Sequence, residues 1–210
     1  MNKKLVTIID YKMGNVRSVA KAFEAIGCKT LISNKSDDVG KASFLVLPGV
    51  GTFGEGMRHL TELGLIEPLR DQVFNKGMPF LGICLGMQLL ANEGYENGYH
   101  KGLGWIDGVV KRFSFNDEKL KIPHMGWNDI NIICDSPLFY DTKNNRTFYF
   151  VHSYHLISED PRMCIARCHY GYDFTAAIQS NNIFATQFHP EKSQKAGLKV
   201  LNNFVNNIDK

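Results

Sequence analysis

The amino-acid sequence predicts an α/β protein with a doubly wound, mostly parallel sheet, helices on both faces, and an added β-rich, antiparallel section in its second half. Three observations lead to this fold class. In the first half, short apolar runs typical of buried strands alternate with amphipathic helical segments. Two of these runs lead directly into glycine-containing turns. Beyond residue 104 the segments become short, β-rich and separated by turns.

The elements of the first half follow from their apolar patterns. Residues 5–10 and 44–47 are nearly continuous apolar runs, as expected for strands covered on both faces. Residues 16–26 carry apolar side chains on one helical face, and Gly27 is a natural end for that helix. The expected strands are therefore residues 5–10, 44–47 and 80–84, and the expected helices are residues 16–26, 60–76 and 85–93.

The second half differs in character and is predicted to form hairpins and sheet-edge strands on the α/β core. Its strand-like segments are residues 108–110, 129–132, 148–151, 174–178 and 184–188. An amphipathic helix over residues 197–208 closes the chain. Since neither repeats nor long linkers interrupt this order, we expect a single domain spanning residues 1–210.

Composition excludes several classes of function. The net charge is only +3 and the basic residues are scattered, which argues against nucleic acid as the main partner. No apolar stretch approaches the ~18 residues of a membrane helix, and the first run is too short for a signal peptide. The five cysteines lack zinc-site spacing, so we expect no metal, and apart from Cys84 we interpret them as small buried or half-buried thiols. These features predict a cytoplasmic protein that needs no metal or other cofactor.

The first chemical motif surrounds Cys84. Residues 82–86 read Gly-Ile-Cys-Leu-Gly at a predicted strand-to-helix junction. Small residues on both sides of a nucleophile permit the sharp turn called a nucleophile elbow, and the following helix N-terminus favours the reactive thiolate. Alone, the motif fits a buried cysteine before a helix at least as well.

The second motif is His189-Pro190-Glu191, directly after the apolar run at residues 184–188. A thiol nucleophile needs an imidazole as general base, and a carboxylate can fix the tautomer of that imidazole. Pro190 restricts the backbone, so both neighbouring side chains leave a rigid segment. The tripeptide alone fits a sheet-edge histidine beside a solvated glutamate equally well.

The third motif is the loop at residues 48–51, Pro-Gly-Val-Gly, at the end of another predicted parallel strand. Its glycines allow main-chain N–H groups to approach a ligand closely, as an oxyanion hole requires, although an ordinary turn explains it as well. The three motifs follow strands whose carboxyl ends meet at one edge of a parallel sheet. Their joint occurrence predicts a catalytic site there.

The sequence resembles the class I (triad-type) glutamine amidotransferases. The segments that carry the resemblance are residues 47–53 (LPGVGTF), 82–88 (GICLGMQ) and 187–193 (QFHPEKS). Further segments narrow the resemblance to the glutaminase subunits of imidazole glycerol phosphate synthases: residues 123–128 (PHMGWN), 148–154 (FYFVHSY), 10–11 and 14–15. Together these motifs extend from residue 10 to residue 193 and are highly specific.

The resemblance implies a role for each matching residue. The catalytic residues would be Cys84 as nucleophile, His189 as proton carrier and Glu191 as its orienting carboxylate. Main-chain N–H groups of Leu85 and the Val50 loop would hold the oxyanion, and L-glutamine would lie against Gly51, Gln88, Ser153 and Tyr154. Positions that match the partner interface and the ammonia exit are Asn15, Met125, Trp127, Tyr149 and Lys192. The implied partner is a (β/α)8-barrel cyclase subunit that uses the ammonia to make imidazole glycerol phosphate and aminoimidazole carboxamide ribotide in histidine biosynthesis.

Several alternatives remain open at this stage. Tyr149, Met125 and Trp127 could simply pack in the core. Lys12 departs from the small residue expected beside the interface, and Ala185 and His155 are lesser departures. A paralogous subunit could instead supply ammonia for amidino groups on bacterial surface sugars. More distant alternatives are a γ-glutamyl hydrolase and a catalytically silent glutamine-binding subunit.

Overall fold

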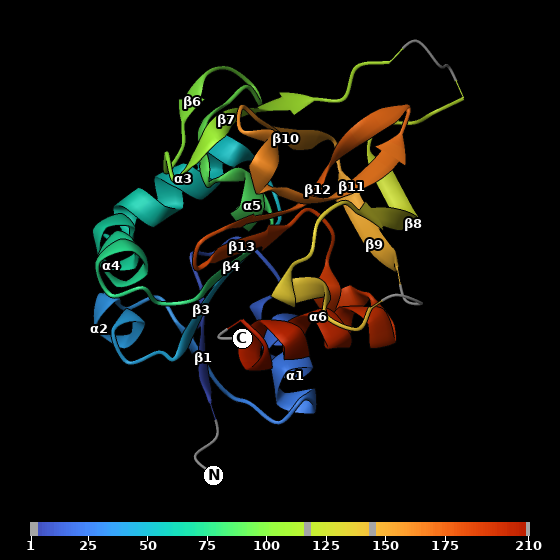
Figure 1. Cartoon of the computed structure of the whole chain (residues 1–210). Coiled ribbons are helices and arrows are strands. Elements are labelled where there is room, and N and C mark those ends of the chain that lie inside the picture. Colours follow the sequence, from blue (N-terminus) through green and yellow to red (C-terminus); the bar gives the residue numbers. More distant parts are fainter. Residues whose placement is uncertain (1–3, 116–118, 143–145, 209–210) are drawn as a thin grey trace.

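A mixed sheet forms the centre of the molecule (Figure 1). Within the described residues, 4–115, 119–142 and 146–208, the computed structural model has a nine-stranded sheet in the order β2-β1-β3-β4-β13-β12-β11-β8-β9. The ends of the domain expected at residues 1–210 lie outside this described part. The parallel strands are β2 (Lys29–Ser33), β1 (Leu5–Ile9), β3 (Phe44–Gly49), β4 (Phe80–Cys84) and β13 (Ile183–Thr186). The antiparallel strands are β12 (Tyr172–Ser180), β11 (Cys164–Tyr170), β8 (His124–Ile132) and β9 (Thr147–His152).

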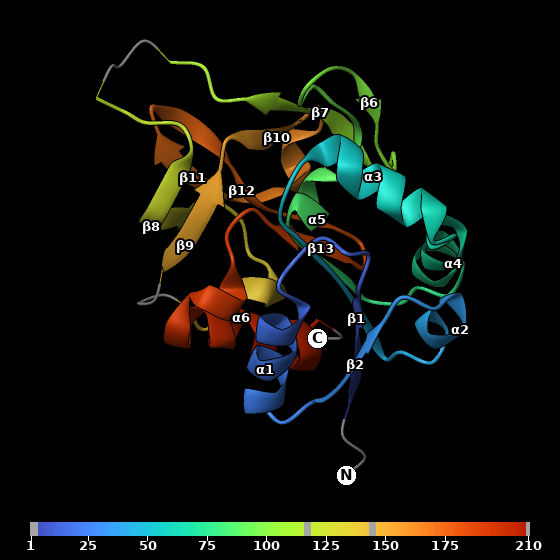
Figure 2. The ribbon, with the colours of Figure 1, turned by 180° about the vertical axis from the view of Figure 1, so that it is seen from behind.

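Helices cover both faces of the parallel half, which confirms the predicted α/β class. Helices α1 (Val16–Ala25) and α6 (Gln194–Asn206) lie together on one face (Figure 1). Helices α2 (Ser36–Val39), α3 (Phe53–Glu62) and α4 (Ile66–Arg70) lie on the other, as the view from behind also shows (Figure 2). The fully apolar sequence of β3 reflects this burial, because Val46 packs in the first layer and Leu47 in the second.

A second, four-stranded sheet lies over the α3 side of the molecule (Figure 1). Within the described residues its strands are, in spatial order, β10 (Tyr154–Ser158), β7 (Ile106–Arg112), β5 (Ala91–Gly94) and β6 (His100–Lys101). Val110 and Leu156 from this sheet enter the same apolar layer as Leu47. The small sheet thereby holds β10 near the carboxyl ends of β3 and β4, where α5 (Leu85–Gln88) contacts it.

Three expected elements differ in the structure. The predicted helix at residues 60–76 is two helices, α3 and α4, followed by a π-helical turn at Asp71–Asn75, because Gly64 adopts a positive φ of 63° between them. The predicted helix at residues 85–93 stops at Gln88. Leu90 instead accepts main-chain hydrogen bonds from Trp105 and Ile106, which turns the chain into β5.

The third difference concerns the apolar run at residues 184–188. Its strand, β13, is a central parallel neighbour of β4 rather than an appended hairpin or edge strand. The consequence is that β3, β4 and β13 are adjacent, so their carboxyl ends meet. In the part of the chain that the structure describes, no helix is long and apolar enough to span a membrane.

Candidate active site

Cys84 stands on a strained turn where β4 passes into α5. Its backbone has φ 54° and ψ −107°, a conformation that is unfavourable for a residue with a side chain. Two glycines make room for this turn. A Cβ on Gly82 would lie 2.8 Å from the Gly86 carbonyl oxygen, and one on Gly86 would collide with the Leu47 carbonyl. The sequence motif therefore forms the sharp strand-to-helix turn that its spacing predicts, and Cys84 is nearly buried, with 5% of the residue exposed.

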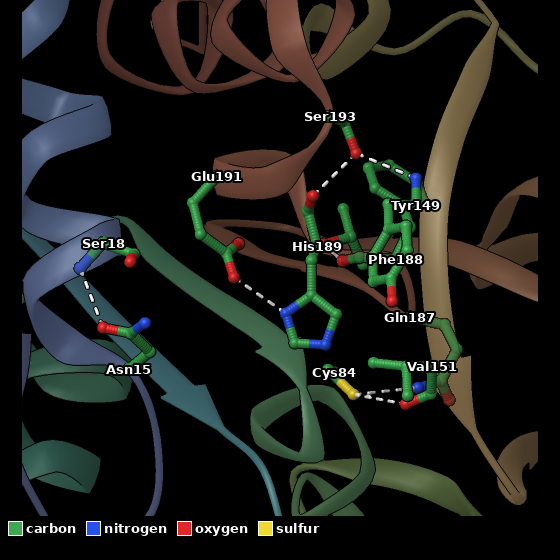
Figure 3. A network of polar contacts seen from close by, with 11 residues as sticks. Asn15, Ser18, Cys84, Tyr149, Val151, Gln187, Phe188, His189, Glu191 and Ser193 are labelled. Carbon is green, nitrogen blue, oxygen red and sulfur yellow. Dashed lines mark hydrogen bonds and ion pairs between the residues drawn. The ribbon is translucent and has the colours of Figure 1, made fainter. Parts of the chain in front are cut away.

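His189 and Glu191 form a buried pair next to Cys84. Oxygen Oε1 of Glu191 lies 2.8 Å from Nδ1 of His189, and Figure 3 shows the imidazole ring between this carboxylate and the Cys84 side chain. The carboxylate accepts, so Nδ1 carries a proton. Nitrogen Nε2 of His189 is buried and has no hydrogen-bond partner among the described groups. Although burial favours the neutral ring, interactions with Cys84 and Glu191 raise the pKa of His189 to about 10.

Strand β9 and the turn after β13 fix the position of the histidine. The His189 N–H donates to the Tyr149 carbonyl at 2.9 Å. The buried Ser193 hydroxyl donates to the His189 carbonyl at 2.6 Å and accepts from the Tyr149 N–H at 3.0 Å (Figure 3). These bonds hold His189 at one place relative to the sheet, as a proton-transferring group requires.

A cavity of about 330 Å³ opens beside the sulfur. Every predicted oxyanion and substrate-binding residue lines it together with Cys84: Val50, Gly51, Leu85, Gln88, Ser153 and Tyr154. His189 and Glu191 lie behind the sulfur, with side chains only 3% exposed. The structure thus brings the three sequence motifs to one place at the carboxyl edge of the sheet.

The side-chain nitrogen of Gln88 donates two hydrogen bonds within the protein. Its Nε2 donates to the Tyr154 carbonyl at 2.8 Å and to Oε1 of Gln187 at 3.1 Å. Gln187 is fully buried, and its own Nε2 donates to the Cys84 sulfur at 3.6 Å. The thiol also lies 3.9 Å from the Val151 carbonyl (Figure 3). A continuous chain of hydrogen bonds therefore joins the sulfur, through Gln187 and Gln88, to the main-chain carbonyl of Tyr154, which also lines the cavity.

Sequence reasoning did not single out Gln187, Glu96 or His152. Gln187 stands inside the triad motif, so its position was visible, but nothing in the sequence shows that its amide faces the sulfur. Glu96 and His152 also line the cavity; Glu96 lies outside the sequence motifs, and His152 lies within the segment 148–154. Burial raises the pKa of Glu96, and a hydrogen bond of 2.8 Å from the Phe53 N–H to its carboxylate opposes this.

The predicted interface residues form a surface patch close to the triad, which we call the docking patch: Met125, Trp127, Tyr149 and Lys192. Met125 is 61% exposed and Trp127 is 49% exposed, so core packing is the wrong interpretation for these two. Tyr149 is half-buried. The ring of Trp127 meets the ring of Tyr149 edge-on at 6.0 Å, and the Lys192 ammonium lies 5.7 Å from the centre of the Tyr149 ring.

Asn15 is exposed and caps helix α1, accepting a hydrogen bond from the Ser18 N–H at 3.1 Å. In Figure 3 it lies on the far side of Glu191 from His189. The helix cap gives this residue a structural role besides the expected interface role.

The other cysteines are free thiols. Cys28, Cys164 and Cys168 are buried as expected, but Cys134 is exposed, so the expectation of a buried or half-buried thiol is wrong there. Cys134 follows β8, where the chain leaves the sheet and turns toward solvent. Among the described residues there is no cluster of His, Cys, Asp and Glu side chains that could hold a metal ion.

Comparison with known proteins assigns the chain to a family. The family model of class I glutamine amidotransferases matches residues 7–208. A solved structure described as a glutamine amidotransferase aligns with 98% of this chain and 99% of its own, with a TM-score of 0.74 and 18% identity. A second, PurLQS from Thermotoga maritima, has a TM-score of 0.72 at 20% identity and aligns with 97% of this chain and 98% of its own. The chain belongs to the class I glutamine amidotransferases.

Sequence relatives define the family more narrowly. Imidazole glycerol phosphate synthase subunit HisH 1 of Campylobacter jejuni strain RM1221 is 51% identical over 96% of this chain and 99% of its own length. The HisH subunits of Syntrophotalea carbinolica and Aquifex aeolicus are 48% and 46% identical. Their alignments include 95% and 97% of this chain, and 98% and 97% of the relatives' own lengths.

Proposed function

We propose that the chain is the glutaminase subunit of an imidazole glycerol phosphate synthase. It hydrolyses L-glutamine to glutamate and ammonia for a cyclase subunit in histidine biosynthesis. The observation that carries this proposal is the arrangement of Cys84, His189 and Glu191 at the ends of adjacent parallel strands, beside a cavity of about 330 Å³. The names of relatives with 46–51% identity supply the reaction context.

The first half of the reaction breaks the carbon–nitrogen bond of the side-chain amide. The Cys84 thiolate attacks the amide carbon and forms a tetrahedral oxyanion. Main-chain N–H groups of Leu85 and the Val50 loop stabilise this charge. The intermediate collapses to a thioester as the imidazolium of His189 gives its proton to the departing nitrogen, which leaves as ammonia.

In the second half, a water molecule attacks the thioester while neutral His189 accepts its proton. The second tetrahedral intermediate then expels the Cys84 sulfur and releases glutamate. Glu191 keeps Nδ1 protonated and stabilises the imidazolium each time it forms.

Charge complementarity orients the substrate. Among the described residues that line the cavity, Glu96 is the one acidic side chain, and its carboxylate suits the substrate's α-ammonium group. Because Nε2 of Gln88 is already bonded to protein, its carbonyl oxygen is the group available to accept from the substrate. The main chain of Ser153 and Tyr154 completes the site.

The proposed partner is a (β/α)8-barrel cyclase that binds over the docking patch. Direct transfer keeps the ammonia reactive, because ammonia released into neutral water becomes mostly ammonium, which is not a nucleophile. A docked exit that excludes water avoids this loss. The proposal places the enzyme in the cytoplasm, where its cysteines stay reduced.

The test is to purify the complex of this chain with the cyclase of the same organism and compare it with a Cys84→Ser complex. We expect Cys84→Ser to abolish glutamine-dependent synthesis while synthesis from added ammonium salt persists, because only amide cleavage needs the thiolate. Near-normal glutamine turnover in the Cys84→Ser complex would remove this residue from the role of nucleophile.

A further inference from the structure

Tyr11 carries a buried polar group that the proposed reaction does not use. The residue follows strand β1 and is fully buried, with 0% exposure. Its hydroxyl has no hydrogen-bond partner among the described groups. A buried hydroxyl without a partner is unfavourable, so a conformation that offers it an acceptor is stabilised relative to this one.

The hydroxyl lies against the loop that is proposed to hold the oxyanion. A Cβ added to Gly49 would collide with the Tyr11 hydroxyl oxygen, so this oxygen occupies the side of Gly49 where a side chain would be. The same added Cβ would lie 2.9 Å from the Cβ of Leu85, the other proposed oxyanion donor. The phenol therefore reaches the junction of residues 49–51 with the start of helix α5.

The segment around Tyr11 is fixed and encloses the loop. Nδ1 of His59, on helix α3, donates to the Tyr11 carbonyl at 3.1 Å, because a carbonyl can only accept. The side chain of Met13 packs against Gly51, where an added Cβ would lie 2.7 Å from the methionine methyl group. The ring therefore presents its hydroxyl from a rigid support, while the loop has glycines on both sides of Val50 and can rotate a peptide easily.

The hydroxyl acts as a donor at every pH at which the enzyme works. Burial, and secondarily the nearby Cys84, raise the pKa of Tyr11 well above its ordinary value, so the phenol keeps its proton. Main-chain carbonyl oxygens are the acceptors that residues 48–51 can offer. In the conformation seen here none of them reaches the hydroxyl.

We propose that Tyr11 is a positioning residue for the oxyanion loop: its hydroxyl donates to the Gly49 carbonyl when the Gly49–Val50 peptide turns its N–H toward the substrate. Rotation of a peptide by about 180° exchanges the directions of its carbonyl and its N–H. In the present loop the Gly49 carbonyl does not bond the Tyr11 hydroxyl. The rotation redirects this carbonyl toward the tyrosine as the N–H of Val50 enters the site. The Tyr11 hydroxyl thus stabilises the loop conformation in which the Val50 N–H faces the substrate, which we call productive. It makes no hydrogen bond to the loop in the conformation described here, which we call resting. This inference rests on the proposed function.

The test is Tyr11→Phe in the complex of this chain with its cyclase. Glutamine hydrolysis is measured with and without the cyclase's nucleotide substrate, alongside synthesis from ammonium salt and thermal unfolding. Tyr170→Phe is the matched control, because it removes a hydroxyl that donates to the Lys121 carbonyl at 2.6 Å, far along the chain from the loop. Both variants keep the aromatic ring.

We expect Tyr11→Phe to lower kcat measured with the nucleotide substrate about three- to tenfold, the size of one neutral hydrogen bond, with KM and ammonia-dependent synthesis unchanged. Its melting temperature should not fall, since the lost hydroxyl has no partner in the resting state. Tyr170→Phe should leave kcat with the nucleotide substrate unchanged and lower the melting temperature. A kcat with the nucleotide substrate within about twofold of wild type, or a raised KM together with a lower melting temperature, overturns the role of Tyr11. A wild-type complex that fails to hydrolyse glutamine contradicts the proposed function instead.

Discussion

The side-chain nitrogen of Gln187 donates to the Cys84 sulfur at 3.6 Å. Gln187 can hold this direction because its Oε1 accepts from Gln88, which fixes the plane of the amide. An N–H donor stabilises the negative charge of a thiolate and restrains its position. Because Gln88 also bonds the Tyr154 carbonyl, the wall of the substrate cavity and the nucleophile share one support.

Replacing Gln187 with methionine should therefore slow the chemistry of the thiol. Met is similar in size and apolar, so it removes the donor while filling the space. We expect alkylation of Cys84 by iodoacetamide at neutral pH, and kcat with glutamine, to fall about tenfold. Measurements belong in a Cys134→Ser background, because that exposed thiol would also react. Unchanged alkylation would show that the Gln187 amide does not support the thiolate.

Much of the site could be predicted because its parts are local in sequence. The glycines around Cys84 are needed for a sharp turn at that residue. His189 and Glu191 are only two residues apart, so their pairing is also a local feature. The meeting of the three motifs at one edge also follows from the rule that parallel strands share a carboxyl edge. The central position of β13 beside β4 does not follow from that rule and differs from the prediction.

Features that depend on long-range contacts could not be predicted. The end of α5 at Gln88 is set by hydrogen bonds from residues 105 and 106 to Leu90, and no local signal reports them. The orientation of Gln187 depends on Gln88, 99 residues away along the chain. The exposure of Trp127 reflects which face of β8 the sheet leaves uncovered, which the alternation of residues alone does not decide.

Glu191→Gln should weaken catalysis and change its pH dependence. The amide can still accept from Nδ1 of His189, but it no longer stabilises the imidazolium, so the pKa of His189 falls from about 10 toward its ordinary value. We expect kcat to fall about tenfold to a hundredfold and the alkaline limb of the pH profile to move to lower pH.

The same substitution should lower the free energy of unfolding more at acidic than at alkaline pH. A raised pKa in the folded state stabilises the fold fully below the ordinary value of 6.5, and this contribution disappears as pH rises toward 10. Urea unfolding should therefore show a larger loss from Glu191→Gln at pH 6 than at pH 9.5. Equal losses at both values would contradict the ion pair.

Buried histidines beside the cavity should make the fold sensitive to acid. Nδ1 of His152 donates to the Tyr154 carbonyl at 2.8 Å, and its Nε2 accepts from Nδ1 of His124 at 3.1 Å. Nε2 of His124 accepts in turn from the Asn128 amide at 3.2 Å. Both rings are neutral in this arrangement. An added proton on either ring would place two N–H donors face to face, where one must now accept. Burial lowers the pKa of His124 to about 4 and that of His152 well below its ordinary value.

The unfolded chain therefore binds protons first as pH falls from about 6.5 toward 4. We expect the free energy of unfolding to drop over this range by roughly 3 kcal/mol for His124 alone. Urea titrations at pH 7.5, 6 and 5 measure this slope. His169→Gln is the control, because it removes a histidine whose side chain is 73% exposed rather than buried. A flat profile between pH 7.5 and 5 would show that these rings do not stay neutral on folding.

Trp127→Ala should weaken binding to the cyclase more than other surface substitutions. An exposed tryptophan that packs edge-on against Tyr149 can bury a large area on docking, and such residues often contribute about 2 kcal/mol or more. We expect Kd to rise roughly 30-fold, measured by calorimetry, with little change in the melting temperature of the free chain. Tyr140→Ala is the control, since Tyr140 is 63% exposed but lies outside the docking patch. Equal Kd values for the two variants would place the interface elsewhere.

Lys12 tests the identity of the partner. Its side chain is exposed, and its backbone has a positive φ of 67°, with the Lys12 N–H donating to the Asp10 carboxylate at 3.2 Å. If Lys12 meets an acidic residue of the histidine-pathway cyclase, Lys12→Glu should slow association and reduce its dependence on salt, because a rim charge acts mainly on the association rate. Stopped-flow mixing at two ionic strengths measures this, and Lys29→Glu, at an exposed position on β2, is the matched control. Strong binding of the wild-type chain, with stimulated glutamine hydrolysis, supports the histidine assignment. An active triad without any binding to that cyclase would instead favour a partner that builds amidino groups on surface sugars.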